Sequence, residues 1–171
     1  MSEKNINSNG NISTKTLTML IQQISDESYN AHLYLKIYSY LKNKGLDNMA
    51  AHFRHQFEEE IEHQKMIADY ITDRNEDIIV LGVNEVDFEP TNLLEVANTY
   101  LKQEQHTTKK LINIAKSAFE ESDFITFSFM QEMINNQKEE EEEAFTFLDK
   151  VELIGEDWSN IVLLDQAFKI K

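Results

Sequence analysis

FRHQFEEEIEHQKMIADYI, residues 53–71, carries the pattern that decides the fold. Together with one alanine just upstream, its apolar side chains recur at helical spacing and predict a buried helix face: Ala50, Phe53, Phe57, Ile67 and Ile71. We expect this helix to begin near Asp47, a candidate N-cap, and to end near Arg74. The same face carries Glu60 and His63, one turn apart. These polar residues need a physical reason, because an unpaired buried carboxylate costs several kcal/mol.

The rest of the chain is also mainly helical by its periodicity. Further helices are predicted over about residues 14–43, 92–119 and 123–153. The first of these has the apolar stripe Leu17, Leu20, Ile24, Ala31, Leu35, Tyr38 and Leu41, and the second has the stripe Leu94, Ala97, Leu101, Thr108, Leu111 and Ala115. Residues 75–91 hold the only proline and break the helical period, which indicates a long crossover connection. Residues 160–170 form either a short fifth helix or a docked tail.

Two antiparallel hairpins joined by one long crossover make an all-α four-helix bundle. At 171 residues the chain fits one domain, which we expect to span residues 14–171 after a flexible polar tail over residues 1–13. The formal charge of −15 opposes binding to nucleic acid and favours cations as partners. Because no apolar run is long enough for a membrane span or a signal peptide, we expect a cytoplasmic protein without a membrane partner.

Acidic residues interrupt the apolar stripe of every long helix. Glu27 lies on the inward stripe of the first helix and Glu104 on that of the third. On the fourth helix periodicity leaves two candidates open, Glu140 and Glu141. Four buried acids without a counter-charge would be prohibitively costly, so the cluster implies a bound cation. Carboxylates with one imidazole, here His63, suit Fe, Mn or Zn better than Ca or Mg.

Weaker signals have ordinary explanations. The remaining histidines have no partner acid at a matching level and are expected at the surface or its boundary: His32, His52, His55 and His106. No methionine is a convincing haem ligand, so no haem is expected. Glu-x-x-His is common by chance, and a single inward glutamate is usually a boundary residue. One alternative function is therefore a non-catalytic acidic bundle that buffers metal ions.

Five short stretches resemble those of the bacterial non-haem ferritins, in the same order and at the same spacing. They are ESYNAHLY (27–34), EEIEHQKMIADYITD (59–73), YLKQEQ (100–105), DFITFSFMQ (123–131) and NQKEEE (136–141). The likeness extends from about Leu17 to Asp165 and implies a ferritin-like four-helix bundle, with the crossover between helices two and three and a short C-terminal fifth helix.

The resemblance also implies roles for individual residues. Glu27, Glu60 and His63 match the ligands of a first iron site, and Glu60, Glu104 and Glu140 match those of a second, with Glu60 bridging. It is this likeness that selects Glu140 over Glu141. Tyr34 matches a tyrosine that supplies an electron or orients a ligand, and Gln137 matches a glutamine beside the centre. Glu59, Glu139 and Glu140 match a third, outer iron site, in which Asn136 replaces the usual glutamate.

The function implied is that of a ferroxidase and iron store. Such a protein oxidises Fe²⁺ with O₂ or H₂O₂ and keeps ferric mineral inside a cage of about two dozen identical subunits, a closed symmetric assembly. Bacterioferritins and rubrerythrins carry a second Glu-x-x-His on the fourth helix, whereas residues 140–143 here are all glutamate. A peroxide-detoxifying miniferritin is the remaining alternative within the wider family, although its site lies between subunits.

Overall fold

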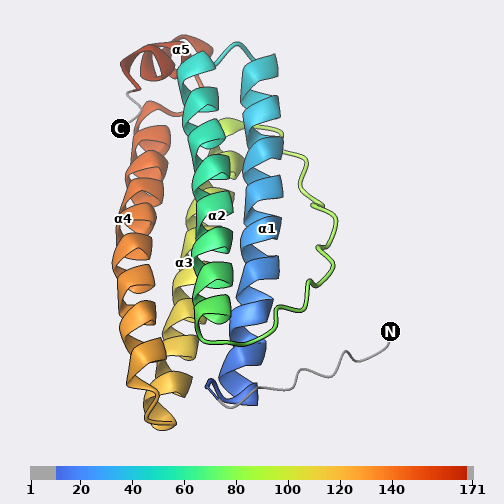
Figure 1. The fold of residues 1–171 in the computed structure, drawn as a ribbon. Helices are drawn as coiled ribbons and strands as arrows, with labels where there is room; N and C mark the ends of the chain where they lie inside the picture. Colours follow the sequence, from blue (N-terminus) through green and yellow to red (C-terminus); the bar gives the residue numbers. More distant parts are fainter. Residues whose placement is uncertain (1–10, 169–171) are drawn as a thin grey trace.

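The computed structural model describes residues 11–168, which form five α-helices (Figure 1). They are α1 (Thr14–Asn43), α2 (Asp47–Asp73), α3 (Leu93–Glu120), α4 (Phe124–Ile154) and α5 (Trp158–Ala167). The first four make a bundle in which α1 packs along α2 and α3 along α4, and α5 lies across one end of it. The segment between α2 and α3 runs the length of the bundle as a crossover. The predicted architecture is confirmed, and the last segment is a helix.

Most helices begin with a side-chain cap. Ser13, Asn92, Asp123 and Asp157 each accept a hydrogen bond from a backbone N–H of the first turn of the helix that follows. At α2 the prediction was wrong, because Asp47 is the first helical residue and the N-cap is Leu46, whose side chain makes no capping bond.

Asp165 of α5 supplies the cap that α2 lacks. It is 6% exposed, and its Oδ1 accepts the N–H of Met49 at 2.8 Å, while Oδ2 accepts the N–H of Asn48 at 3.4 Å. A carboxylate at a helix N-terminus also meets the positive end of the helix dipole. Asp165 therefore caps α2 and also holds α5 against it, although Met49 and Asp165 are 116 positions apart in the sequence.

The apolar core divides into two clusters along the bundle axis. Towards α5 it is rich in aromatic residues, among them Tyr34, Phe53, Tyr100 and Phe147. Towards the opposite end it is mostly aliphatic, with Leu20, Ile67, Ile71, Leu111 and Met130. Two predicted core positions were wrong: Leu35 is 42% exposed and Leu94 is 36% exposed, whereas Tyr34 and Leu93, each one residue earlier, are buried.

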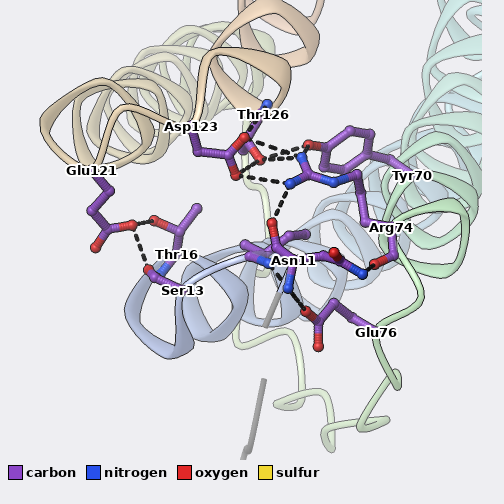
Figure 2. Close-up of polar contacts among 10 residues, drawn as sticks. Asn11, Ser13, Thr16, Tyr70, Arg74, Glu76, Glu121, Asp123 and Thr126 are labelled. Carbon is purple, nitrogen blue, oxygen red and sulfur yellow. Dashed lines mark hydrogen bonds and ion pairs between the residues drawn. The ribbon is translucent and has the colours of Figure 1, made fainter. Parts of the chain in front are cut away.

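A polar network closes the end of the bundle opposite α5 (Figure 2). Arg74, the C-cap of α2, donates to Asp123 before α4 and to the backbone carbonyl of Asn11. The N–H groups of Asn11 and Ile12 donate to Oε1 of Glu76 at 3.0 and 3.1 Å. This network ties three separate chain segments together.

Residues 11–13, which we assigned to a flexible tail, are packed onto the bundle. Ile12 is 2% exposed, and Ser13 caps α1. The remainder of the predicted tail, residues 1–10, lies outside the described residues, as do residues 169–171. Among the described helices, none combines the length and the apolar character that a membrane span requires.

Candidate metal centre

A buried polar layer separates the two apolar clusters. Along each of the four long helices, the clustered apolar residues on one side of the inward acid belong to one cluster and those on the other side belong to the other cluster. The layer consists of Glu27 of α1, Glu60 and His63 of α2, Glu104 of α3, and Gln137 and Glu140 of α4. Glu27 and Glu104 are fully buried, and the side chain of Glu140 is only 13% exposed. The predicted inward acids of all four helices thus meet at one depth of the bundle.

Three of these residues converge most closely. Glu27, Glu60 and His63 each offer one ligand atom, and these atoms all lie within 4.8 Å of one another. The spacing of three residues on α2 puts Glu60 and His63 on the same face, with Oε2 and Nδ1 3.5 Å apart. The other ring nitrogen of His63, Nε2, lies 3.2 Å from Oε1 of Glu140.

Hydrogen-bond donors hold two of the carboxylates and leave a third less restrained. Glu27 accepts from the side-chain amide of Gln23 at 2.8 Å. Glu104 accepts from the hydroxyl of Tyr34 and from the amide of Gln137, the latter at 2.6 Å. Oε2 of Glu60, in contrast, is buried without a hydrogen-bond partner among the described residues. Nδ1 of His63 lies 3.5 Å from this oxygen without forming a hydrogen bond, so the oxygen is available to a cation.

The layer changes the proton affinities of its own members. Burial raises the pKa of Glu27, raises that of Glu60 well above its usual value, and raises that of Glu104 to about 8. Burial acts to lower the pKa of His63, but hydrogen bonds and charges from Glu140 and other carboxyls outweigh it and raise this pKa to about 11. The metal-free layer therefore holds protons that a bound cation must displace.

The structure separates Glu140 from Glu141, which periodicity could not. Glu140 faces His63 in the layer, whereas Glu141 accepts a hydrogen bond from the hydroxyl of Thr108 on α3 at 2.6 Å. Both side chains are partly buried, so burial alone would not have distinguished them. Their partners do, and they place only Glu140 at the polar layer.

The predicted outer site is more open. Glu59 is partly buried, accepts from the amide of Gln56 and lies 3.5 Å from His55, whereas Glu139 and Asn136 are exposed. Within residues 11–168, ligand atoms of acids and histidines gather within 4.8 Å only at Glu27, Glu60 and His63. The sets matched to the second iron site and the outer site are therefore more widely spaced here.

Sequence reasoning missed two polar residues and misplaced a third. Gln23 and Asn30 lie one turn before and one turn after Glu27 and both donate to it; amides at these spacings from an inward acid were the available signal. His52, predicted at the surface or its boundary, is 6% exposed and packs against Tyr100 and three phenylalanine rings. Burial lowers its pKa to about 4, which keeps the ring neutral.

Comparisons with known proteins agree with this geometry. The ferritin-like domain family matches residues 17–154. A bacterial non-heme ferritin of Staphylococcus epidermidis is 30% identical over 155 residues, covering 91% of this chain and 93% of the relative. One from Campylobacter jejuni is 29% identical over 92% of this chain and 95% of the relative. The open-pore ferritin structure from Archaeoglobus fulgidus superposes with a TM-score of 0.90 at 31% identity, over 94% of this chain and 98% of that one.

Proposed function

The chain belongs to the ferritin family, and from this premise we propose that it oxidises Fe²⁺ at the polar layer and stores the ferric product inside a closed cage of identical subunits. The observation that carries the proposal is the convergence of Glu27, Glu60 and His63 in a buried site where one oxygen of Glu60 has no hydrogen-bond partner among the described residues. Buried carboxylates with one imidazole are donors that suit iron.

We assign two iron positions that share one carboxylate. Glu27 and His63 hold the first iron, Glu104 and Glu140 hold the second, and Glu60 bridges the two. The hydrogen bonds support this division, because Glu27 and Glu104 are each held by side-chain donors, while Oε2 of Glu60 accepts no hydrogen bond among the described residues and has Nδ1 of His63 3.5 Å away. Four carboxylates also balance the charge of two divalent ions.

The reaction consumes iron as its substrate. Two Fe²⁺ ions bound together each give up one electron, and O₂ or H₂O₂ accepts the pair, so no single-electron product has to be released. The carboxylates favour the more highly charged Fe³⁺ product by simple attraction. The protons held by Glu104 and His63 in the metal-free site leave when iron binds, because a ligand must be deprotonated.

Two neighbours of the centre orient its ligands. The hydroxyl of Tyr34 and the amide of Gln137 both donate to Glu104. Burial raises the pKa of Tyr34 well above its usual value, so the hydroxyl keeps its proton and remains a donor at neutral pH. We assign Gln137 the role of fixing the Glu104 carboxylate, and Tyr34 the role of orienting it or supplying an electron.

The rest of the proposal concerns the path and fate of the iron. Glu59 and Glu139, beside Glu140, form an outer position that is weakened by Asn136, and it serves for transit of iron between the centre and the store. An acidic chain of net charge −15 suits the inner wall of a container for iron. We further propose a single domain over residues 14–171, onto which residues 11–13 also pack, a cytoplasmic location, and no role for haem, nucleic acid or a membrane.

A matched pair of substitutions on α2 tests the centre. Glu60→Ala removes the shared carboxylate, whereas Glu62→Ala removes an exposed acid that pairs with Lys65 on the outside of the same helix. We expect Glu62→Ala to oxidise Fe²⁺ in air at the wild-type rate and Glu60→Ala to lose rapid oxidation, as measured by stopped-flow absorbance. Equal rates in the two variants would refute a shared ligand at Glu60, and slow oxidation by the wild type would favour a metal buffer.

A further inference from the structure

Asn30 of α1 is fully buried beside the polar layer and uses its whole side-chain amide. Its Nδ2 donates to Oε2 of Glu27 at 3.1 Å and to the hydroxyl of Thr107 on α3 at 3.2 Å. Its Oδ1 accepts from the amide of Gln103, also on α3, at 2.6 Å. An amide NH₂ has two hydrogens to donate, so both are engaged and neither is left for another partner.

These contacts fix which way the amide of Asn30 points. Because Gln103 donates to Oδ1, the carbonyl side must face Gln103, and the NH₂ side must then face Glu27. Thr107 holds the same NH₂ from a second direction. Turning the amide over would put its NH₂ against that of Gln103 and its oxygen against the carboxylate of Glu27, so these buried groups would lose their hydrogen bonds.

Gln23, the other donor to Glu27, differs from Asn30 in this respect. It belongs to the same helix as Glu27, and its bond to that carboxylate spans one helical turn. Asn30, in contrast, is held by two residues of α3 and itself donates to a carboxylate of α1, so it links the position of that carboxylate to α3. The Glu27 oxygen that Asn30 binds is thus held relative to the helix that carries Glu104.

We infer that Asn30 is a positioning residue for the first iron position, held in place by Gln103 and Thr107, and that it sets how tightly Glu27 and its neighbours bind a divalent ion. This inference rests on the proposed function. Residues that orient a ligand through hydrogen bonds typically change metal affinity by roughly 10- to 100-fold when they are replaced.

Metal-free protein titrated with Co²⁺ provides the test, because Co²⁺ reports its coordination through visible absorption and needs no oxidation. We expect Asn30→Leu to weaken the first Co²⁺ step by roughly 10- to 100-fold and to alter its spectrum. Gln103→Met and Thr107→Val should each weaken it less. Combined with Asn30→Leu they should add little further loss, because all three changes break one connected set of bonds.

The matched control is Thr16→Val, which removes an equally buried hydroxyl hydrogen bond, 2.8 Å to Ser117, far from the polar layer. It should lower the melting temperature and leave Co²⁺ binding unchanged. If Asn30→Leu behaves like Thr16→Val, Asn30 is merely structural and the inference is overturned. If Asn30→Leu does not fold and assemble, the Co²⁺ affinities of Gln103→Met and Thr107→Val provide the test. Wild-type Co²⁺ affinity in both of these variants would overturn the inference. Failure of the wild type to bind Co²⁺ would instead contradict the proposed function.

Discussion

Glu140 and Glu141 are adjacent acids with different partners, and this difference gives a prediction at the residue scale. Glu140→Gln removes a charge 3.2 Å from Nε2 of His63, whereas Glu141→Gln keeps an oxygen that can accept from Thr108. We expect the first change to slow Fe²⁺ oxidation at least roughly tenfold, the scale of a lost metal ligand or orienting group, and the second to leave the rate near that of the wild type. Initial rates in air measure both. A slow Glu141→Gln with a normal Glu140→Gln would reverse the assignment.

Protonation of the polar layer predicts how pH affects the metal-free protein. The pKa of Glu104 is raised from 4.5 to about 8 and that of His63 from 6.5 to about 11. In both cases the folded chain holds a proton that the unfolded chain has lost, so the free energy of unfolding must fall as pH rises, between about pH 4.5 and 8 for Glu104 and between about pH 6.5 and 11 for His63. We expect the melting temperature of metal-free protein to fall most steeply between about pH 6.5 and 8, where both groups act, and the affinity for Zn²⁺ to rise over the same range. A melting temperature that rises with pH would contradict this assignment of protons.

His52 predicts the opposite slope at lower pH. Burial lowers its pKa from 6.5 to about 4, so in this window the unfolded chain binds a proton that the folded chain does not. Stability conferred by the neutral ring is therefore lost as pH falls from about 6.5 towards 4, by up to about 1.4 kcal/mol per pH unit. His52→Phe keeps an aromatic ring among Tyr100 and Phe147 and should remove this contribution. Denaturant titrations measure it as the difference in unfolding free energy between wild type and variant, which should grow as pH rises from about 4 to 6.5, because the polar layer affects both proteins alike. A difference that does not change with pH would contradict this role of His52.

At this scale the sequence predicts the acids better than their surroundings. Glu27, Glu60 and Glu104 could be found because an acid on an apolar stripe violates the helical pattern. For Asn30 the spacing from Glu27 was a local signal, but its contacts with Gln103 and Thr107 of α3 could not be predicted from that spacing. His52 was misplaced for a similar reason: three of the four rings that pack against it come from α3, α4 and the residue after α5.

At the scale of elements, Asp165 links α5 to α2. Asp165→Ala leaves the first turn of α2 without a cap, because Leu46 supplies none. We expect the free energy of unfolding to fall by about 0.5–2 kcal/mol and α5 to pack less firmly against α2. Trp158, the only tryptophan, is the first residue of α5, so its fluorescence reports on the docking of this helix. Asp149→Ala, at an exposed position on α4, is the control, and equal effects of the two changes would show that the cap is unimportant.

Periodicity determines where the helices run but not how deeply each residue lies. The four long helices could be placed within a residue or two, because glycine, proline and polar turns interrupt the apolar stripes between them. Leu35 and Leu94 were nevertheless predicted inward and are exposed, since each lies one residue beyond a side chain that takes the buried place, Tyr34 and Leu93 respectively. The choice between a helix and a docked tail for α5 depended on contacts with α2 that a local pattern does not contain.

At the scale of the whole molecule, the polar layer interrupts an otherwise continuous core. Replacing the layer by apolar residues would remove the cost of burying Glu27, Glu60 and Glu104, so a bundle selected only for stability would have little reason to keep it. Its presence on four helices at one level is therefore best explained by function. The cage that we propose could not be derived from the residue pattern of one chain, because a face that meets another subunit can look like ordinary surface in a single subunit.

Aerobic loading with excess Fe²⁺, followed by size-exclusion chromatography and iron counting on the same fractions, tests the central claim most directly. We predict that the chain elutes as one large assembly and that iron co-elutes with it in amounts far above the roughly two ions per chain that a dinuclear centre alone would hold. Glu60→Ala should elute at the same size with much slower loading. A small particle carrying no more than about two iron ions per chain would contradict the storage function.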